Sequence, residues 1–330
     1  MVSTRLQLSA LAGVVALTLA GCGSAESDSA KADDSGSTVE VEDNNGKQTV
    51  ASPPKSVVAT DNRTFQTLSD WGIELKGGAV SLMSEDLEYT QDDSILDLGS
   101  HREPDLEKVV EAKPDLIVNG QRFAQFHDDL AKLAPDATVL ELDPRDGEDF
   151  DAELRRQTTV LGEVFGKQDE AKKLVDDFDA SIERARAAYD DSDDKTMGLI
   201  TSAGDIGYAA PSVGRTVGPV FDILDLTPAL EVEEGSEDHQ GDDISVEAIA
   251  KSNPELMVVL DRDASFAPEE REKGSAPAAE VLEDSEALGD VPAIKDDKIV
   301  YFPEDTYLNE GIQTYTEFFN DFADKLEEQK

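Results

Sequence analysis

Polar and apolar positions alternate along this chain with two different periods, and these periods predict a succession of strands and helices. Short apolar runs bounded by turn residues predict buried strands at 56–60, 94–99, 137–142, 196–201 and 298–302. Apolar spacings of three and four predict amphipathic helices at 62–72, 124–134, 148–166, 216–225, 277–288 and 314–329. Because helices and strands alternate throughout, we expect an α/β protein with mainly parallel sheets.

One helix–turn–strand pattern occurs twice, 140 positions apart. The segment DLEKVVEAKPDLIV aligns with SVEAIAKSNPELMV, so that Pro114 matches Pro254 and Arg122 matches Arg262. Each proline ends a helix because its ring cannot continue the helical backbone, and the apolar run that follows predicts a buried strand. Any two α/β units share such signals, which is the alternative explanation. A constant offset over about eighteen residues favours two lobes that are built alike.

A long helical pattern separates the two copies. Residues 168–190 keep a helical apolar period without glycine or proline, which predicts a rigid connecting helix. We therefore expect an N-terminal α/β lobe at 47–167 and a C-terminal α/β lobe at 191–330. Ligands of open α/β sheets bind beyond the carboxyl ends of the strands. Because Arg122 and Arg262 each follow a copy of the repeated strand, we expect them to line one cleft.

The N-terminal segment has the pattern of a secretory signal peptide at residues 1–21. Arg5 precedes a largely apolar stretch that is shorter than the ~20 residues needed to cross a bilayer. The sequence LAGC follows, and Cys22 is the only cysteine, so no intramolecular disulfide can form. Residues 22–46 are mostly small, polar and acidic, which predicts a flexible tether.

The charge and the absence of catalytic motifs exclude several function classes. The chain has 74 acidic and 29 basic residues, for a formal charge of −45. No basic stripe is available to neutralise phosphates, so nucleic acid is excluded as a partner. The sequence contains no G-x-S-x-G, H-E-x-x-H or P-loop motif, and no EF-hand spacing. We therefore expect a binding protein and not an enzyme.

Several stretches together resemble one protein family. They are EPDLEKVVEAKPDLIVNGQR, GYAAPSVGRTVGPVFDILDL, DHQGDDISVEAI, VVLDRD and PEDTYLNEGIQ. In their order and spacing the chain resembles the substrate-binding lipoproteins of bacterial iron–siderophore ABC importers, of the catecholate-siderophore-binding type. The resemblance implies the class III periplasmic binding protein fold, with two Rossmann-like lobes joined by one long helix. It also implies that LAGC is a lipobox, with a lipid on Cys22 that anchors an extracytoplasmic protein to the cell membrane.

The resemblance further implies a positive patch beneath the ferric siderophore. Its arginines match Arg122, Arg215 and Arg262, and Arg102 often joins them, whereas Arg63 is a weaker candidate because relatives vary there. Arginine suits a ferric catecholate because it is always charged and stacks on planar rings. Any one of these arginines taken alone would be read as a solvated surface residue.

Four further residues receive roles from the same resemblance. His239 and Tyr307 are expected to coordinate Fe(III) directly when the siderophore is tetradentate, since ferric iron accepts oxygen donors and also imidazole. Glu107 and Glu247 are expected to dock on arginines of the permease. The alternative for these two glutamates is a local role, because an acid in the first turn of a helix favours the helix dipole.

The remaining expectations concern cargo and partners. We expect no intrinsic cofactor, a ferric siderophore as the transported ligand, an ABC permease as the partner and a monomeric protein. The other histidines and two tyrosines are expected to be structural or surface residues: His101, His127, Tyr301 and Tyr315. Two alternatives stay open: the same fold binding haem or a corrinoid, and an exported hydrolase. Three dispersed histidines do not resemble a closed cage for a free metal ion.

Overall fold

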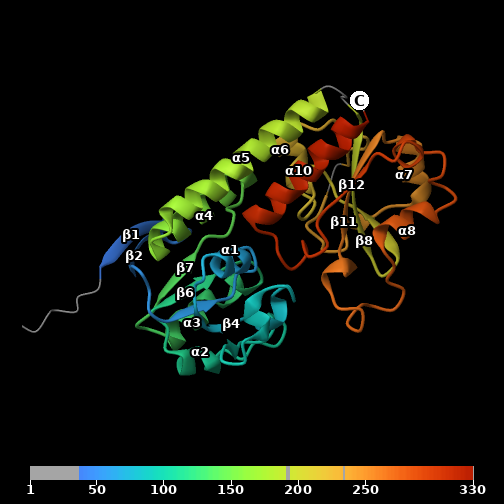
Figure 1. Ribbon diagram of the computed structural model, residues 1–330. Helices are drawn as coiled ribbons and strands as arrows, with labels where there is room; N and C mark the ends of the chain where they lie inside the picture. The colour runs from blue at the N-terminus through green and yellow to red at the C-terminus, as the bar shows by residue number, and fades with distance from the viewer. Residues whose placement is uncertain (1–36, 191–193, 233–234, 330) are drawn as a thin grey trace, which may run out of the picture. The chain divides into compact units, whose positions relative to one another are not determined.

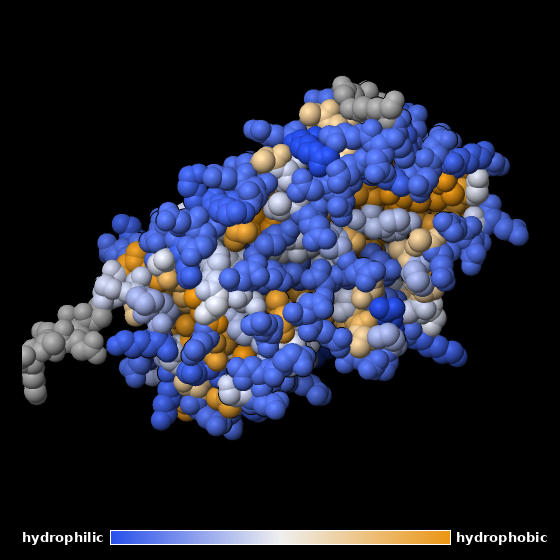
Figure 2. All heavy atoms as spheres, in the orientation of Figure 1, coloured by the Kyte–Doolittle hydropathy of each residue, from blue (hydrophilic) through white to orange (hydrophobic). Residues whose placement is uncertain are grey.

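The computed structural model describes residues 37–190, 194–232 and 235–329, and these described residues belong to one compact unit. Cys22, the predicted signal peptide and the first part of the predicted tether lie outside the described residues. In the described part of the chain, no helix combines the length and the apolarity needed for a membrane crossing. The face of the molecule in Figure 2 is mostly hydrophilic, in keeping with the high negative charge.

The first sheet has five parallel strands in the order β5-β4-β3-β6-β7, of which β4, β6 and β7 are labelled in Figure 1. Its strands are β3 (Val57–Ala59), β4 (Leu75–Gly78), β5 (Leu96–Asp97), β6 (Leu116–Asn119) and β7 (Thr138–Glu141). The helices between them are α1 (Phe65–Asp70), α2 (Glu107–Ala112) and α3 (His127–Leu133). All four residues of β6 are buried, as expected for a central strand covered on both faces.

The second sheet has five strands in the order β10-β9-β8-β11-β12. They are β8 (Thr196–Ser202), β9 (Asp205–Tyr208), β10 (Asp242–Asp243), β11 (Leu256–Asp261) and β12 (Ile299–Tyr301). Strands β8, β11 and β12 are parallel, whereas β9 and β10 are antiparallel to their neighbours. The helices of this half are α6 (Gly218–Leu224), α7 (Val246–Ser252), α8 (Ala278–Glu283) and α9 (Pro292–Lys295). The expectation of an α/β fold with mainly parallel sheets is confirmed, with an antiparallel edge on the second sheet.

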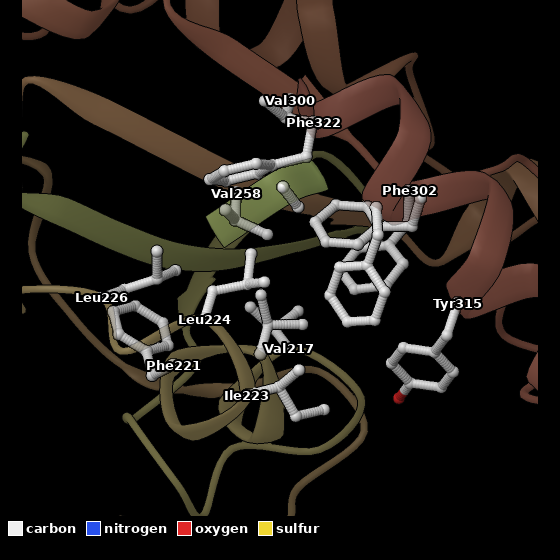
Figure 3. Close-up of a cluster of buried hydrophobic side chains, with 14 of the residues drawn as sticks. Val217, Phe221, Ile223, Leu224, Leu226, Val258, Val300, Phe302, Tyr315 and Phe322 are labelled. Atoms are coloured by element: carbon white, nitrogen blue, oxygen red, sulfur yellow. The ribbon is translucent and has the colours of Figure 1, made fainter. Parts of the chain in front are cut away.

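A long helix connects the two sheets. Helix α5 (Gln168–Asp190) packs along α4 (Phe150–Phe165) and along the C-terminal helix α10 (Ile312–Glu328) (Figure 1). Helices α4 and α5 approach closely at Gly162, where an added Cβ would lie 2.5 Å from the Cβ of Ala171. The aromatic side chains of α10 complete the core around the second sheet, where Phe302, Tyr315 and Phe322 lie close to Val217 and Leu224 of the α6 region (Figure 3).

The two copies of the repeat end their helices in the same way. Lys113 ends α2 and Asn253 ends α7, and both adopt the left-handed conformation, with φ of 46° and 54°. Each is followed by the proline of the repeat and then by a buried strand. The predicted helix–turn–strand units are therefore present at both places, and β6 and β11 occupy interior positions in their sheets.

The predicted tether does not hold for residues 38–46. Strand β1 (Thr38–Asp43) pairs with β2 (Gly46–Ala51) in an antiparallel hairpin. The valines of β1 alternate with acidic residues, and Val41 and Val50 are buried in the core of the first half. The segment was predicted as a tether because of its acidic composition. Its valines nevertheless recur at every second residue, and this period gives the hairpin an apolar face to bury.

Candidate ligand-binding site

Three arginine side chains surround the ring of Tyr307. The guanidinium carbon of Arg122 lies 4.8 Å from the ring centroid, that of Arg215 lies 5.1 Å away and that of Arg262 lies 4.8 Å away. At these distances a cation is attracted to the face of an aromatic ring. The three arginines expected in a positive patch and the tyrosine expected to coordinate iron therefore form one group, which we call the arginine–tyrosine cluster.

The two sheets bring Arg122, Arg262 and Tyr307 together at the carboxyl ends of their parallel strands. Arg122 lies in a short 3₁₀ turn that follows β6, and Arg262 follows β11 directly. Tyr307 lies in the loop that connects β12 to α10, and Arg215 precedes α6. This is the edge at which open α/β sheets bind ligands. The repeat thus places Arg122 and Arg262 at the same edge, each with its guanidinium carbon 4.8 Å from the centroid of one aromatic ring.

Arg122 is the least neutralised member of the cluster. Its Nη2 donates a hydrogen bond of 3.2 Å to the carbonyl oxygen of Tyr307, while its Nη1 is buried without a hydrogen-bond partner. Among the described residues it forms no ion pair with a carboxylate. Burial lowers the pKa of Arg122 and the charge of Arg215 acts in the same direction, while the charge of Glu310 opposes them. An anion that bound here would therefore pair with a positive charge that has no carboxylate partner among the described residues.

Arg262 is held more firmly. Only 7% of it is exposed, and its Nη1 lies 3.0 Å from the hydroxyl oxygen of Ser202 and 3.1 Å from Oδ1 of Asp263. Its Nε is buried without a partner. The exposed carboxylate of Glu272 lies 3.7 Å from the same Nη1. The contacts to Ser202 and Asp263 fix the guanidinium beside Tyr307 and leave its Nε free to donate.

A buried carboxylate, Glu310, anchors the third arginine. Its Oε1 accepts hydrogen bonds from Nη2 of Arg215 at 2.8 Å, from Nε of Arg215 at 3.0 Å and from the hydroxyl of Thr216 at 2.9 Å. Burial alone would raise the pKa of Glu310, but the charges of Arg215, Arg63 and Arg122 outweigh it and lower the pKa to about 2. Glu310 is therefore ionised and acts as the internal counter-ion of the cluster.

Arg63 links Glu310 to a second acidic group. Its Nη2 lies 3.4 Å from Oε2 of Glu310, and its Nη1 lies 3.2 Å from Oδ1 of Asp143. Asp61 is fully buried nearby, and burial together with the charge of Asp143 raises the pKa of Asp61 to about 7. Arg63, the weaker candidate for ligand binding, is thus engaged by two carboxylates and ties residues of the first half to the loop that precedes α10.

The phenol of Tyr307 is perturbed by the arginines around it. Burial raises the pKa of Tyr307, but the charges of Arg122, Arg215 and Arg262 more than offset this, so that the net pKa is lowered. A lowered pKa favours the phenolate, which is the form that binds ferric iron. The ring of Phe266 lies 5.6 Å from that of Tyr307 and adds an aromatic wall that sequence reasoning had not identified.

Two cavities border the cluster. One of about 240 Å³ is lined by Arg122, Arg262 and Tyr307, together with His101, Arg102, Phe266 and the apolar Leu82 and Leu308. The other, of about 410 Å³, lies on the Arg215 side and is lined mainly by polar and charged residues of both halves, including Arg63, Asp143, Arg145 and Glu237. Arg102 is exposed and lines the smaller cavity, where the resemblance had placed a fourth basic residue.

His239 lies in a loop that is connected to the cluster. The next residue, Gln240, donates a hydrogen bond of 3.3 Å to the hydroxyl oxygen of Ser202. The same oxygen accepts a hydrogen bond from Arg262. Burial lowers the pKa of His239, and although Asp238 acts in the opposite direction, Arg262 reinforces the lowering. The imidazole is therefore neutral at pH 7 and carries a free lone pair, the form in which histidine binds a metal.

Of the histidines and tyrosines expected to be structural or surface residues, one lines a cavity at the cluster. Tyr315 is buried and donates a hydrogen bond to the carbonyl of Thr216, and His127 lies 2.9 Å from Glu141 at a distance from the cluster. His101, expected to be structural or a surface residue, lines the smaller cavity instead. Sequence reasoning also missed Glu310, because a single glutamate has no distinguishing signal among 74 acidic residues.

The two glutamates expected to dock on a permease lie in the repeated helices. Glu107 is in the first turn of α2, and Glu247 is in the first turn of α7. Both side chains are exposed. At these positions both carboxylates interact favourably with the helix dipole, and both are also available to a partner.

Comparison with known families agrees with this architecture. A family model described as periplasmic binding protein matches residues 57–306, which include both sheets and the three arginines of the cluster and end one residue before Tyr307. This chain is a periplasmic binding protein. The resemblance noted in the sequence is confirmed at this level, and the family consists of binding proteins and not of enzymes.

Relatives of known name match most of the chain. The petrobactin-binding protein YclQ of Bacillus subtilis is 25% identical over 324 residues, which cover 96% of this chain and 97% of YclQ. The ferric-anguibactin-binding protein FatB of Vibrio anguillarum is 28% identical over 250 residues, which cover 75% of this chain and 76% of FatB. The crystal structure of YclQ shares the fold, with a TM-score of 0.74 at 24% identity, over 88% of this chain and 99% of YclQ. Three further relatives from Bacillus subtilis are named lipoproteins.

Proposed function

We propose that this periplasmic binding protein is a receptor for a ferric siderophore, of the catecholate type, that it delivers to an ABC permease. The observation that carries the proposal is the half-buried guanidinium of Arg122, which has a buried, unpartnered Nη1 and no ion-pair partner among the described residues. A buried donor without a partner costs about 1–3 kcal/mol, and more when it belongs to a charged group. An anionic ligand beside Arg122 removes that cost, so the site favours an anion.

The shape of the cluster supports a planar aromatic anion. Arg122 and Arg262 both lie beside the Tyr307 ring, and Phe266 and Leu82 provide apolar walls to the adjacent cavity. A ferric catecholate spreads its negative charge over flat rings, and guanidinium groups both pair with such charge and stack on such rings. The names of YclQ and FatB support the same ligand class, since petrobactin and ferric anguibactin are named as their ligands.

The cluster also offers donors for the iron itself. We assign Tyr307 and His239 as direct ligands of Fe(III) when the siderophore leaves two positions open. The arginines favour the phenolate of Tyr307 and the neutral imidazole of His239, and these are the protonation states that coordination requires. Arg102 and Arg215 complete the positive patch around the cargo.

Delivery and anchoring complete the proposal. Two lobes, residues 47–167 and 191–330, close modestly around the cargo. The stiff connecting helix at 168–190 limits how far they move relative to each other. Lipid on Cys22 holds the monomeric protein at the outer face of the cell membrane, as the names of its lipoprotein relatives support. Glu107 and Glu247 then present carboxylates to the permease.

A panel titration tests the ligand class. Quenching of the single tryptophan, Trp71, reports binding of ferric triscatecholates, tetradentate biscatecholates, citrate–catecholates, hydroxamates and haem. We expect the catecholates to bind most tightly and the hydroxamates, which lack anionic aromatic rings, to bind at least about tenfold more weakly, a difference of 1.4 kcal/mol. Preference for haem would replace this proposal by the haem alternative, and turnover of any ligand would indicate an enzyme.

The docking proposal has its own test. We expect the Glu107→Lys and Glu247→Lys double variant to bind its cargo like the parent protein but to lose stimulation of ATP hydrolysis by the permease in proteoliposomes. The physical reason is charge repulsion between the new lysines and the arginines of the partner. The control replaces Glu111 and Glu255, which carry the same charge elsewhere in the two repeats. Unchanged stimulation in the double variant would remove these glutamates from the interface.

A further inference from the structure

The side chain of His101 lies at the tip of a turn that the backbone holds without its help. The amide of Glu103 donates to the carbonyl of Ser100 at 3.1 Å, and the amide of Asp105 donates to the carbonyl of Leu98 at 2.8 Å. Gly99 has a φ of +72°, and a Cβ there would lie 2.9 Å from the carbonyl oxygen of Glu103. Because these backbone contacts define the turn, the imidazole has no structural task in it.

The imidazole of His101 instead faces the arginine–tyrosine cluster from the first half of the chain. It lines the 240 Å³ cavity together with Arg122, Arg262 and Tyr307. Its Nδ1 is buried and has no hydrogen-bond partner, although buried polar atoms are nearly always partnered. Two histidines thus lie near one cluster, His101 from the turn after β5 and His239 from the loop before β10.

The surroundings keep this imidazole neutral. Burial lowers the pKa of His101, and the charges of Arg122, Arg102 and Arg215 lower it further, with a smaller effect from His239. A neutral imidazole has one N–H and one lone pair, whereas the arginines around it supply only hydrogen-bond donors. What His101 adds to the cluster is therefore a lone pair.

We propose that His101 is a third protein ligand for the iron of the cargo, placed in the first half of the chain and acting with Tyr307 and His239 from the second half. This rests on the proposed function. Coordination forms one Fe–N bond from the imidazole lone pair, releases one water molecule from the ferric ion and leaves the iron in the ferric state. Three protein donors match ferric complexes in which the siderophore fills only three of the six positions.

This assignment extends the class of cargo. A hexadentate siderophore leaves no position open and needs only the arginines. A tetradentate siderophore leaves two positions, which Tyr307 and His239 fill. A tridentate catecholate leaves three, and only then does His101 have a position to occupy. The contribution of His101 to affinity should therefore grow as the number of donor atoms in the siderophore falls.

The experiment measures the affinity and the visible spectrum of three ferric complexes with synthetic hexadentate, tetradentate and tridentate catecholates. We compare the parent protein with His101→Ala and His101→Gln. The matched control is His127→Ala, because His127 lies beside Glu141 in the parent protein. Loss of a group that only supports a metal ligand already costs about 10- to 100-fold in metal affinity, so loss of a direct ligand should cost at least as much. We expect that loss, with a shift of the charge-transfer band, for the tridentate complex in both His101 variants and not in the control.

The outcomes separate this inference from the function on which it rests. If both His101 variants bind the tridentate complex as the parent does, with the same spectrum, the inference is wrong while the receptor function stands. If they lose affinity equally for all three complexes without a spectral change, His101 holds the siderophore and not the iron, which also overturns the inference. If the parent protein binds none of the three complexes, the proposed function itself fails.

Discussion

Replacing Glu310 with glutamine is expected to lower the free energy of unfolding by about 3–5 kcal/mol, the usual cost of removing one partner from a buried ion pair. Glu310 is 1% exposed, and its carboxylate neutralises Arg215 and Arg63 at the same time. Glutamine keeps the shape but not the charge, so two guanidinium groups remain close together without their counter-ion. Urea unfolding followed by the fluorescence of Trp71 measures the change.

Two controls show whether the charge of Glu310 is responsible. Glu304→Gln alters an exposed carboxylate in the same loop and is expected to change the free energy of unfolding by no more than about 0.5 kcal/mol. In the Arg215→Ala background, Glu310→Gln should cost less than it does alone, because one of the stranded cations is gone. A cost below about 1 kcal/mol in the parent background would show that the cluster does not depend on this counter-ion.

The second large effect is expected for cargo binding when Arg122 and Arg262 are both replaced with alanine. A hydrogen bond to a charged group contributes about 1.5–3 kcal/mol, so two lost contacts should weaken binding of a ferric triscatecholate by roughly 10²- to 10⁴-fold. Arg215 is left in place because its removal would strand Glu310. Titration by quenching of Trp71 fluorescence, at more than one salt concentration, measures the loss and the reduced salt dependence.

This variant should remain folded. Arg122 forms no ion pair among the described residues, and Asp263, the partner of Arg262, also accepts hydrogen bonds from the amide of Ala203 and the hydroxyl of Ser275. The control Arg184→Ala removes a surface arginine that pairs with Asp324 and Glu327 on α10. Parent-like affinity in the double variant, with intact folding, would remove the two arginines from the binding site.

The sequence could place Arg122 and Arg262 because each follows a copy of the same helix, turn and strand. The constant offset of 140 positions, the proline after each helix and the apolar run are local signals, and local signals fix where a strand ends. Arg215 carries no such signal, and only the family resemblance pointed to it. The long helix at 168–190 was predictable because its apolar period continues without a break.

The parts that could not be predicted depend on contacts between distant segments. Strand β4 reads LKGG, a poor strand sequence, yet it pairs with β3 because its glycines allow close approach, and a Cβ at Gly78 would lie 3.0 Å from the carbonyl of Ala59. The pairing of β4 with β5 is what brings the turn containing His101 to the cavity. Glu310 likewise becomes recognisable only once Arg63 and Arg215 are seen to converge on it.

The hairpin of β1 and β2 determines how a mechanical load at the N-terminal side would enter the protein. A pull on Ser37 acts at the open end of the hairpin, where the hydroxyl of Ser37 donates a hydrogen bond to the carbonyl of Ser52. The force is therefore carried by one hydrogen-bonded pair of residues at a time. Separation of β1 would proceed as far as Asp43 and Asn44, which are both bonded to Glu141 of β7. Strand β1 therefore gives way under tension before the force reaches the sheet that carries Arg122.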